Sequence, residues 1–477
     1  MKPNRSVTQS RRDFVRQSCC AAVGASGILS VLAQLRVIGA VAADSSDRGR
    51  AAAIPGDFKA LVCLYLQGGN DGTNLLIPAD TPSYAAYAKA RGSLAIGQSS
   101  LLPIVPRKYT DGRSYALHPS VPELQSLFTQ GKLSFLANVG MLVQPTTLSQ
   151  YNAGKGLPPQ LFAHSDQQTQ WMSSVPDKPF TTGWGGRLAD LVNAFNANNQ
   201  ISMSITLSGA NLFQQSDVVT EFAVNSSGAT LLTSGAVNVS TNTAAGTPGV
   251  LDSTRSAVAA SMNTPQSNLM SAAFGAMTKN AINDNTYLAG VLKAAPALKT
   301  AFPGTSTAAR LAMIAKMISM APTLGLKRQI FFVQLGGFDM HGGQAVAHGP
   351  LLAELSGAMK AFYDATAELG VANQVTTFTA SDFGRTYVPN ADGTDHGWGN
   401  HQMIMGGAVG GGDIFGAMPS LTVGANDDTG RGRWIPSTSV DEYNATLATW
   451  FGVSAANLPV VLPNIGRFAR PNLGFMG

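Results

Sequence analysis

Continuous apolar runs alternate with amphipathic segments along most of the chain, and the two patterns predict different elements. Four runs rich in strand-forming residues predict strands, and the first of them is continuously apolar, which predicts a buried strand that pairs in parallel. These runs occupy residues 59–67, 132–139, 329–335 and 375–379. A shorter apolar run, residues 402–407, leads into a cluster of glycines.

The clearest helical pattern follows Pro350 and covers residues 351–370. Between Leu352 and Phe362 the apolar residues recur at steps of three and four, which places them on one face of a helix. That face is the one expected to pack on the sheet.

Further helices are expected between and after the strand runs. For one of them Ser120 is the expected N-cap, with Glu123 at the spacing of a capping box. The expected helices cover residues 120–130, 308–320 and 440–451, with another opening near Trp184. Strands that alternate with helices of this length are typical of an α/β fold.

Residues 219–286 differ in composition from the rest of the chain. Ser, Thr, Asn, Ala and Gly dominate there, with few charged or aromatic residues. We expect an insertion into the α/β domain, formed partly by loop and partly by a helix of small residues.

The first 43 residues predict a signal peptide of the twin-arginine type. Arg11 and Arg12 lie in the sequence SRRDFVR, an apolar run follows over residues 19–43, and residues 40–42 form a small-x-small cleavage site. We therefore expect export by the twin-arginine translocation machinery, to the periplasm or the exterior. A leader retained as an anchor is the alternative, although Arg36 within the apolar run disfavours a membrane span.

The leader also explains the charge and the cysteines. The chain of 477 residues has a net charge of +5, and the leader carries six basic side chains against one acidic side chain. The remaining domain, residues 44–477, is neutral, so it has no basic footprint for nucleic acid. Removal of the leader leaves Cys63 as the one cysteine, which excludes an intrachain disulfide. No later apolar run is long enough to span a bilayer.

The candidate chemistry is concentrated in residues 329–412. Acidic residues and histidines follow two of the predicted strands there: Asp339, His341, Asp382, His396 and His401. Mixed carboxylate and imidazole ligands suit Zn, Mn or Fe, and an oxygen-dominated subset suits Ca or Mg. One or two ions would fit such a set. A purely structural role for the cluster is the alternative.

Asp71 is a further candidate from far upstream. It follows the first strand run within the sequence GGNDGTN, where glycines let the backbone turn sharply. Open α/β sheets place their sites at the carboxyl ends of strands. An ordinary turn is the alternative, because Asn-Asp-Gly is also good turn chemistry.

Several motifs occur in the order found in one exported bacterial family. They are GGNDGTN, HPSVPELQSLFTQGKL, GGFDMHGGQ, SDFGRT and GTDHGWGNHQMIMGGAVGGG, with LPNIGRF near the end. From about residue 61 onward the chain resembles the family known as domain of unknown function 1501. That family resembles the alkaline phosphatase and sulfatase superfamily. The resemblance implies a three-layer α/β sandwich with a central, mainly parallel sheet and metals at the strand carboxyl ends.

The resemblance also implies roles for individual residues. Asp71 would be the metal aspartate after the first strand, and Asp339 with His341 would be a metal pair. Asp382 would occupy the aspartate place of an Ala-Asp-His-Gly segment. His396 or His401 would be the last histidine ligand.

The nucleophile and one ligand depart from the superfamily pattern. The segment around residues 145–154 would lie near the nucleophile position, which makes Thr147 or Ser149 the candidate hydroxyl. Phe383 stands where the superfamily has a metal histidine. Arg385 is the candidate for balancing the charge of an anionic substrate.

We therefore expect an exported hydrolase that uses one or two divalent ions, Zn, Mn or Ca, on a phosphate or sulfate ester. The substrate would be a small molecule or a polymer. The alternative is a non-catalytic exported protein on the same fold that binds a glycan, a cell-surface polymer or a protein partner, and Phe383 favours it.

Overall fold

The computed structural model of the protein describes residues 54, 56–198, 200–229 and 268–477. The predicted signal peptide and the centre of the predicted insertion lie outside the described residues. The chain divides into two units, one of residues 1–50 and 232–283 and the other of residues 51–231 and 284–477. The boundary passes through helix α8 (Leu269–Lys293). The second unit carries the features described below.

A ten-stranded sheet forms the centre of the second unit, in the order β12-β5-β11-β10-β1-β9-β6-β7-β8, with β13 paired to β5. Its strands pair in parallel except at β11 and β8. The strands are β1 (Lys59–Leu66), β5 (Leu133–Gly140), β6 (Ser204–Thr206), β7 (Phe222–Asn225), β8 (Gly228–Ala229), β9 (Arg328–Leu335), β10 (Val375–Ser381), β11 (Asn400–Gly406), β12 (Ile414–Gly416) and β13 (Thr438–Ser439).

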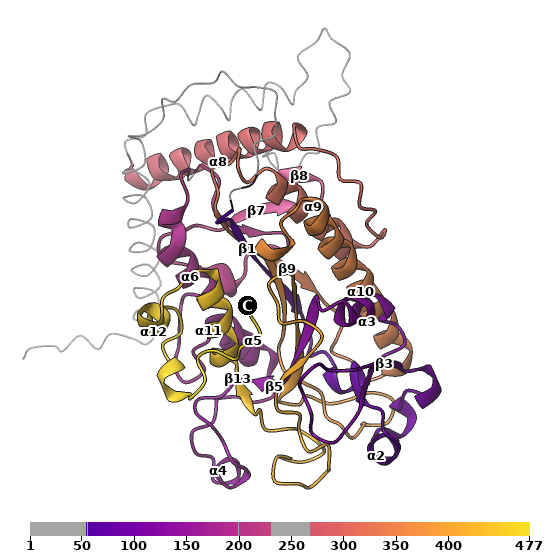
Figure 1. The fold of residues 1–477 in the computed structure, drawn as a ribbon. Coiled ribbons are helices and arrows are strands. Elements are labelled where there is room, and N and C mark those ends of the chain that lie inside the picture. The colour runs from indigo at the N-terminus through magenta and orange to yellow at the C-terminus, as the bar shows by residue number, and fades with distance from the viewer. Residues whose placement is uncertain (1–53, 55, 199, 230–267) are drawn as a thin grey trace, which may run out of the picture. The chain divides into compact units, whose positions relative to one another are not determined.

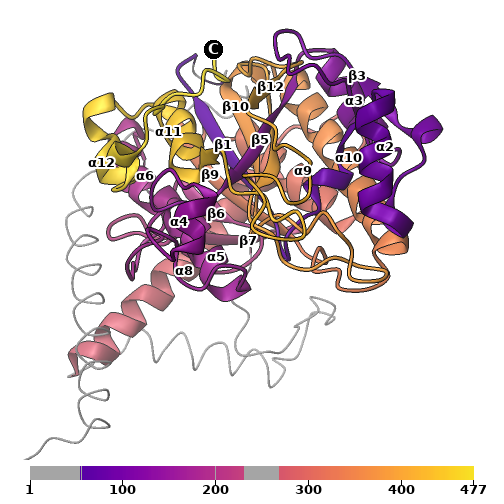
Figure 2. The ribbon, with the colours of Figure 1, turned by 90° about the horizontal axis from the view of Figure 1, so that it is seen from below.

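Helices cover both faces of this sheet (Figures 1 and 2). One layer contains α3 (Pro122–Thr129), α9 (Ser306–Ser319) and α10 (Gln344–Glu368). The other contains α5 (His164–Ser173), α6 (Trp184–Val192), α11 (Val440–Phe451) and α12 (Leu458–Val461). The predicted three-layer α/β sandwich with a mainly parallel central sheet is therefore confirmed.

A small antiparallel sheet lies beside the main one, in the order β2-β4-β3. Its strands are β2 (Leu76–Pro78), β3 (Leu102–Ile104) and β4 (Tyr115–Leu117), and helix α2 (Thr81–Arg91) follows β2. The short helix α4 (Leu148–Asn152) lies in the connection between β5 and α5.

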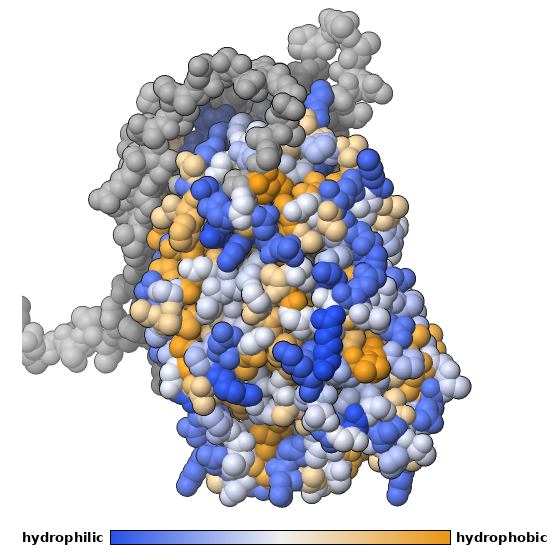
Figure 3. All heavy atoms as spheres, viewed as in Figure 1, coloured by the Kyte–Doolittle hydropathy of each residue, from blue (hydrophilic) through white to orange (hydrophobic). Residues whose placement is uncertain are grey.

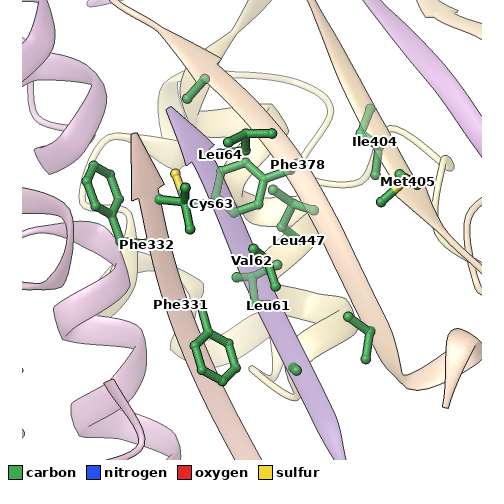
Figure 4. Close-up of a cluster of buried hydrophobic side chains, with 14 of the residues drawn as sticks. Leu61, Val62, Cys63, Leu64, Phe331, Phe332, Phe378, Ile404, Met405 and Leu447 are labelled. Atoms are coloured by element: carbon green, nitrogen blue, oxygen red, sulfur yellow. The ribbon is translucent and has the colours of Figure 1, made fainter. Parts of the chain in front are cut away.

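Strand β1 is the centre of the core. It pairs with β10 along one edge and with β9 along the other. The helices that cover the two faces of the sheet therefore also cover both faces of β1 (Figure 1). Leu61, Val62 and Leu64 have no exposed surface, which explains the continuous apolar run in the sequence. Figure 4 shows them among aromatic side chains of the neighbouring strands, such as Phe331 and Phe378. Cys63 is buried and free, and burial raises the pKa of its thiol.

The four predicted strands are confirmed with small shifts at their ends, and the run at residues 402–407 belongs to β11. Helix α11 begins and ends where it was expected, and its capping box joins Ser439 and Glu442. The other expected capping box is wrong, because α3 begins after Val121 without a side-chain cap. Instead, the backbone N–H of Ser120 donates to Nδ1 of His118 at 3.1 Å.

Helix α10 also differs from the expectation, because it begins at Gln344 and contains Pro350. Proline lacks an N–H, so it was expected to precede the helix rather than lie inside it. The earlier start places His348 within a buried part of α10. Tertiary packing therefore outweighs the local preference at this proline.

The described surface is mixed in character. In the view of Figure 3, hydrophilic and apolar residues are interspersed. Of the large apolar side chains that are strongly exposed, Val105 follows β3 and Val346 lies in α10, whereas Leu269, Met270 and Met277 all lie in α8. Among the helices of the described ranges, none is both long enough and apolar enough to cross a membrane.

Candidate metal centre

Three parallel neighbours bring the predicted site residues to one edge of the sheet. Leu66 at the end of β1 pairs with Leu335 of β9 and with Ser381 of β10, so the three strands end at the same level. The loop after β9 carries Asp339 and His341, and the loop after β10 leads through Asp382 to His396.

Two glycines let the turn after β1 approach these loops closely. Gly68 and Gly69 have φ values of 111° and 81°, in the left-handed region that side chains disfavour. A Cβ atom on Gly68 would lie 2.4 Å from the backbone nitrogen of Asp339. A Cβ atom on Gly69 would lie 2.6 Å from the ring of Phe383. These glycines therefore pack against the loops that carry the site.

Three imidazoles converge on the carboxylate of Asp339. Nε2 of His341 and Nε2 of His396 lie 3.1 Å and 3.2 Å from its Oδ1, and Nε2 of His164 lies 3.3 Å from its Oδ2. Candidate ligand atoms of His164, Asp339 and His396 all lie within 4.8 Å of one another. His341 adds a fourth candidate ligand, because its Nε2 lies 2.9 Å from Nε2 of His396.

His164 reaches this point from the N-terminus of α5, and Asp382 fixes its orientation. Nδ1 of His164 lies 2.7 Å from Oδ2 of Asp382. The other oxygen of Asp382 accepts from the hydroxyl of Tyr65 at 2.8 Å and from the backbone N–H of Gly68 at 3.3 Å. Asp382 is buried, so its role in this structure is to hold the ring of His164. It does not belong to the group of candidate ligands formed by His164, Asp339 and His396.

The other two imidazoles are also held at Nδ1. Nδ1 of His341 lies 3.3 Å from Oδ1 of Asp395, whose second oxygen pairs with Arg431. Nδ1 of His396 lies 2.6 Å from the backbone oxygen of Phe162. Phe162 has a φ of 73°, a conformation that costs a residue with a side chain about 1–3 kcal/mol and that clusters at functional sites.

These contacts settle which ring nitrogen carries the proton. Carboxylate and carbonyl oxygens only accept, so each Nδ1 must be the donor, and in a neutral ring Nε2 then keeps its lone pair. In the neutral form of the rings, the three lone pairs face one another and the carboxylate of Asp339. Metal-bound histidines are commonly held in this way, with the second nitrogen donating to a carboxylate or carbonyl. A cation at this point would satisfy all four groups.

Charge at the centre is set by Arg385. Burial works to raise the pKa of Asp339, but a 2.8 Å hydrogen bond from Arg385 and its positive charge lower that pKa to about 2. Burial lowers the pKa of His396, which favours its neutral, metal-binding form. Asp339 is ionised and 43% exposed, so the centre is open to solvent.

Phe383 packs behind the imidazoles, where the resemblance would place a metal histidine. Its ring centroid lies 4.7 Å from that of His164 and 4.5 Å from that of His396. An imidazole from α5 therefore lies beside the position that lacks one. Asp382, the neighbour of Phe383 in the sequence, contacts that imidazole.

The structure places Arg385 at the centre, where its side chain contacts Asp339 but is buried beneath the solvent-exposed residues. Its side chain is 1% exposed. It donates to the backbone oxygens of Gly68 and Thr394 and to the hydroxyl of Thr394, besides its bond to Asp339. Its role in this structure is to hold and neutralise Asp339.

Asp71 lies in a buried network that is joined to Asp339 indirectly, through Gln344, Thr394 and Arg385. It pairs with Arg91 and accepts hydrogen bonds from Thr73 at 2.7 Å and from the side chain of Gln344 at 2.6 Å. Burial works to raise the pKa of Asp71, but the charge of Arg91 outweighs it and the pKa falls to about 2.

His401 is not brought to the centre either. Its Nδ1 accepts from the backbone N–H of Asn138 at 3.2 Å, and burial lowers its pKa to about 4. The structure gives neither Asp71 nor His401 a hydrogen bond to Asp339 or to the three converging imidazoles.

The two candidate nucleophiles lie on the exposed helix α4. Thr147 is its N-cap and exchanges hydrogen bonds with Gln150. Ser149 is exposed on the first turn. Leu148 and Tyr151 anchor the helix against a cluster that includes Trp398. No hydrogen bond joins Thr147 or Ser149 to the described residues of the centre.

Sequence reasoning missed four residues of the centre: Tyr65, Phe162, His164 and Asp395. His164 lies among polar residues at the start of a short helix, with no strand end or motif beside it. The only signal was its residue type, because the chain has six histidines and three of them meet here. Tyr65 and Phe162 are hydrophobic in type, so their polar contacts could not be read from the pattern.

Comparison with known proteins gives a family and two distant structural likenesses. The family described as "Protein of unknown function (DUF1501)" matches residues 58–431. No curated protein sequence matches the chain. Among solved structures, the PsFucS1 sulfatase from Pseudoalteromonas sp. matches with 9% identity and a TM-score of 0.34, over 84% of this chain and 69% of the other. The protein Ps i-CgsB, in complex with k-i-k-neocarrahexaose, matches with 9% identity and a TM-score of 0.34, over 87% and 77%. Likenesses at this level do not bear on activity.

Proposed function

The chain belongs to the DUF1501 family, and we propose that it is an exported hydrolase of phosphate or sulfate esters that depends on a divalent metal. One observation carries the proposal. Three imidazoles turn their Nε2 atoms toward the carboxylate of Asp339 while each Nδ1 is held by an oxygen acceptor.

The residues present fit a metal. His164, Asp339 and His396 would hold it, with His341 as the additional donor. A set of nitrogen donors with one carboxylate suits Zn or Mn better than Ca, which prefers oxygen. When bound, such an ion would supply Lewis-acid polarisation of a phosphoryl or sulfuryl oxygen.

The remaining residues of the centre prepare it for this role. Asp382 and Asp395 orient two of the imidazoles, and Arg385 keeps Asp339 ionised through its hydrogen bond and charge. The exposed hydroxyls of α4 are the proposed nucleophiles. Ser149 is the better candidate, because the hydroxyl of Thr147 is engaged in the helix cap.

The alternative function is non-catalytic binding of a glycan, a cell-surface polymer or a protein partner. Two observations favour it. An apolar ring, Phe383, occupies the position of a metal histidine, and neither Thr147 nor Ser149 is hydrogen-bonded to the described centre. A bound ion would then organise a binding surface.

Metal content and hydrolysis together test the proposal. Protein purified from the periplasm, which also tests export, is analysed for metal before and after addition of Zn, Mn or Ca. It is then assayed on an aryl phosphate, an aryl phosphodiester and an aryl sulfate. We expect about one ion per chain and hydrolysis of at least one ester, both lost in Asp339→Ala.

The outcomes separate the two functions. Protein that takes up no metal under any of these conditions would sink the metal proposal. A metal-loaded protein that hydrolyses none of the esters would favour the binding function. Activity that survives Asp339→Ala would place the active site elsewhere, and Ser149→Ala with full activity would exclude that hydroxyl as nucleophile.

A further inference from the structure

Three arginines surround the centre, and they differ in what their guanidinium groups are free to bind. Arg385 is buried, and its donors are used by Asp339, Gly68 and Thr394. Arg431 pairs with Asp395 and donates to the backbone oxygens of Val388 and Pro389, in the loop after β10. Neither has a fork of two free N–H groups for a ligand.

Arg433 is different. Its Nε donates to the backbone oxygen of His396 at 2.7 Å, and its guanidinium carbon lies 5.1 Å from the ring centroid of Phe162. Both contacts are to residues of the centre, because Phe162 is the residue whose oxygen holds His396. The side chain is half-buried, and the structure shows no hydrogen bond from Nη1 or Nη2 to the described residues.

The backbone around Arg433 is held as firmly as its side chain. Oδ1 of Asp428 accepts from the N–H groups of Gly430 at 2.7 Å, Gly432 at 2.8 Å and Arg433 at 3.1 Å. The backbone oxygen of Arg433 also accepts hydrogen bonds from the backbone N–H and the hydroxyl of Thr429. A long side chain fixed at its backbone, at Nε and on an aromatic face has little conformational entropy left to lose when a ligand binds.

We propose that Arg433 forms an oxyanion subsite beside the candidate metal centre. Its two terminal nitrogens would donate in parallel to two oxygens of a tetrahedral phosphate or sulfate group. A guanidinium suits this task because its planar fork matches two oxygens at once, which an ammonium does not. The identity of the anion as part of an ester rests on the proposed function, whereas the subsite itself rests on the geometry of Arg433.

Anion binding to the metal-loaded protein tests the subsite. The probes are inorganic phosphate, inorganic sulfate, phenylphosphonate as an ester-like group that is not hydrolysed, and acetate as a planar anion. Titration calorimetry compares the unchanged chain with Arg433→Gln and Arg433→Lys. Arg113→Gln is the matched control, because Arg113 also stacks on an aromatic ring, 5.8 Å from the centroid of Tyr115, and is not part of the centre.

We expect Arg433→Gln to weaken binding of a tetrahedral anion at least about tenfold, as for loss of a charge-assisted hydrogen bond. Arg433→Lys should recover part of the loss, and acetate should change less than phosphate. Equal losses for inorganic phosphate and phenylphosphonate would mean that the subsite binds a free anion and an ester-like group alike. A loss confined to phenylphosphonate would assign the subsite to the ester.

Two results would overturn the inference. One is binding in Arg433→Gln as tight as in the unchanged chain, and the other is no measurable binding of any tetrahedral probe to the unchanged chain. Elemental analysis accompanies each titration, because loss of the bond to His396 could release the metal. If it does, the same titration on the metal-free chain and the metal-free Arg433→Gln variant decides the matter by the same criterion.

This experiment fails separately from the proposed function. A chain that binds phosphate through Arg433 but hydrolyses no ester would remove the hydrolase proposal and leave the subsite. Hydrolysis with unchanged kcat and KM in Arg433→Gln would leave the hydrolase proposal and remove the subsite.

Discussion

Asp71 and Asp339 follow neighbouring parallel strands and have nearly the same electrostatics, yet their surroundings are opposite. Each pairs with an arginine, and each has a pKa lowered to about 2 against the effect of burial. Asp71 is 3% exposed, and donors from its own loop and from α10 occupy its oxygens. Asp339 is 43% exposed and faces three imidazole nitrogens that carry lone pairs.

The comparison shows that a low pKa does not by itself identify a metal ligand. A carboxylate saturated by N–H and O–H donors has no lone pair left for an ion, whereas Asp339 accepts from Arg385 at one oxygen and can bind a cation through the other. The histidines follow the same division. His348 has Nε2 3.0 Å from the side-chain oxygen of Asn70 and is fully surrounded by protein, while His341 is 47% exposed.

The largest expected effect is on stability, at Asp71. In Asp71→Ala the guanidinium of Arg91, which has no exposed surface, keeps its charge without a carboxylate partner. Removing one partner of a buried ion pair typically costs about 3–5 kcal/mol, so we expect a loss of that size in urea unfolding. Metal content of the folded fraction should stay unchanged. A folded variant that has lost its metal would show that Asp71 contributes to the same metal site as Asp339.

The next effect is on metal affinity, at Asp339. Asp339→Asn removes the one carboxylate among the candidate ligands, so we expect affinity for Zn or Mn to fall by at least about 100-fold, or about 2.7 kcal/mol. The free energy of unfolding without metal should fall by less than in Asp71→Ala, because the side chain is partly exposed and the amide oxygen of Asn can still accept from Arg385. Competition with a chromophoric chelator measures the first quantity. An unfolded variant would assign Asp339 to the structural class of Asp71.

A smaller effect is expected at the groups that hold His164. Loss of an orienting carboxylate typically weakens metal binding roughly 10–100-fold, and we expect this of Asp382→Asn. Tyr65→Phe removes only the hydroxyl that donates to Asp382 at 2.8 Å, so its effect should be smaller than that of Asp382→Asn. His164→Gln, measured alongside, should lose at least as much affinity as Asp382→Asn. Unchanged affinity in Asp382→Asn would remove His164 from the ligand set.

The smallest effect is the pH dependence contributed by the buried histidines. Burial lowers the pKa of His118, His348 and His401 to about 4, against about 6.5 in the unfolded chain. Between these values the unfolded chain binds the proton and the folded chain does not, so stability falls as pH drops from 6.5 toward 4.

We expect this loss to reach about 1 kcal/mol for each histidine at pH 5.5, measured by urea unfolding of metal-free protein at several pH values. His401→Gln should have a shallower dependence than the unchanged chain. If the free energy of unfolding changed equally with pH in the two proteins, His401 would be as easily protonated as an exposed histidine. The difference in burial between the two regions would then have a smaller effect than proposed.

The sequence was a reliable guide to the sheet because a strand covered on both faces must be apolar at every position. β1 shows this pattern most clearly, whereas β5, β9 and β10 also contain polar residues and were predicted from their strand-forming residues. It also located Asp339, His341 and His396, since polar residues after parallel strands collect at one edge. It could not rank them against Asp71, Asp382 and His401, which follow the same rule.

What separated these residues was their partners, and partners are a property of the tertiary structure. Arg91 of α2 pairs with Asp71, and His164 of α5 contacts Asp382. His164 is 218 residues from Asp382, and even Arg91, 20 residues from Asp71, is brought there by helix packing. Hydrophobic periodicity fixes the buried face of a helix but not the residues that its end will contact. The sequence by itself therefore determined the fold class and the edge of the sheet where chemistry gathers. Only the tertiary structure decided which carboxylate is buried and saturated by donors and which one is exposed and faces three imidazoles.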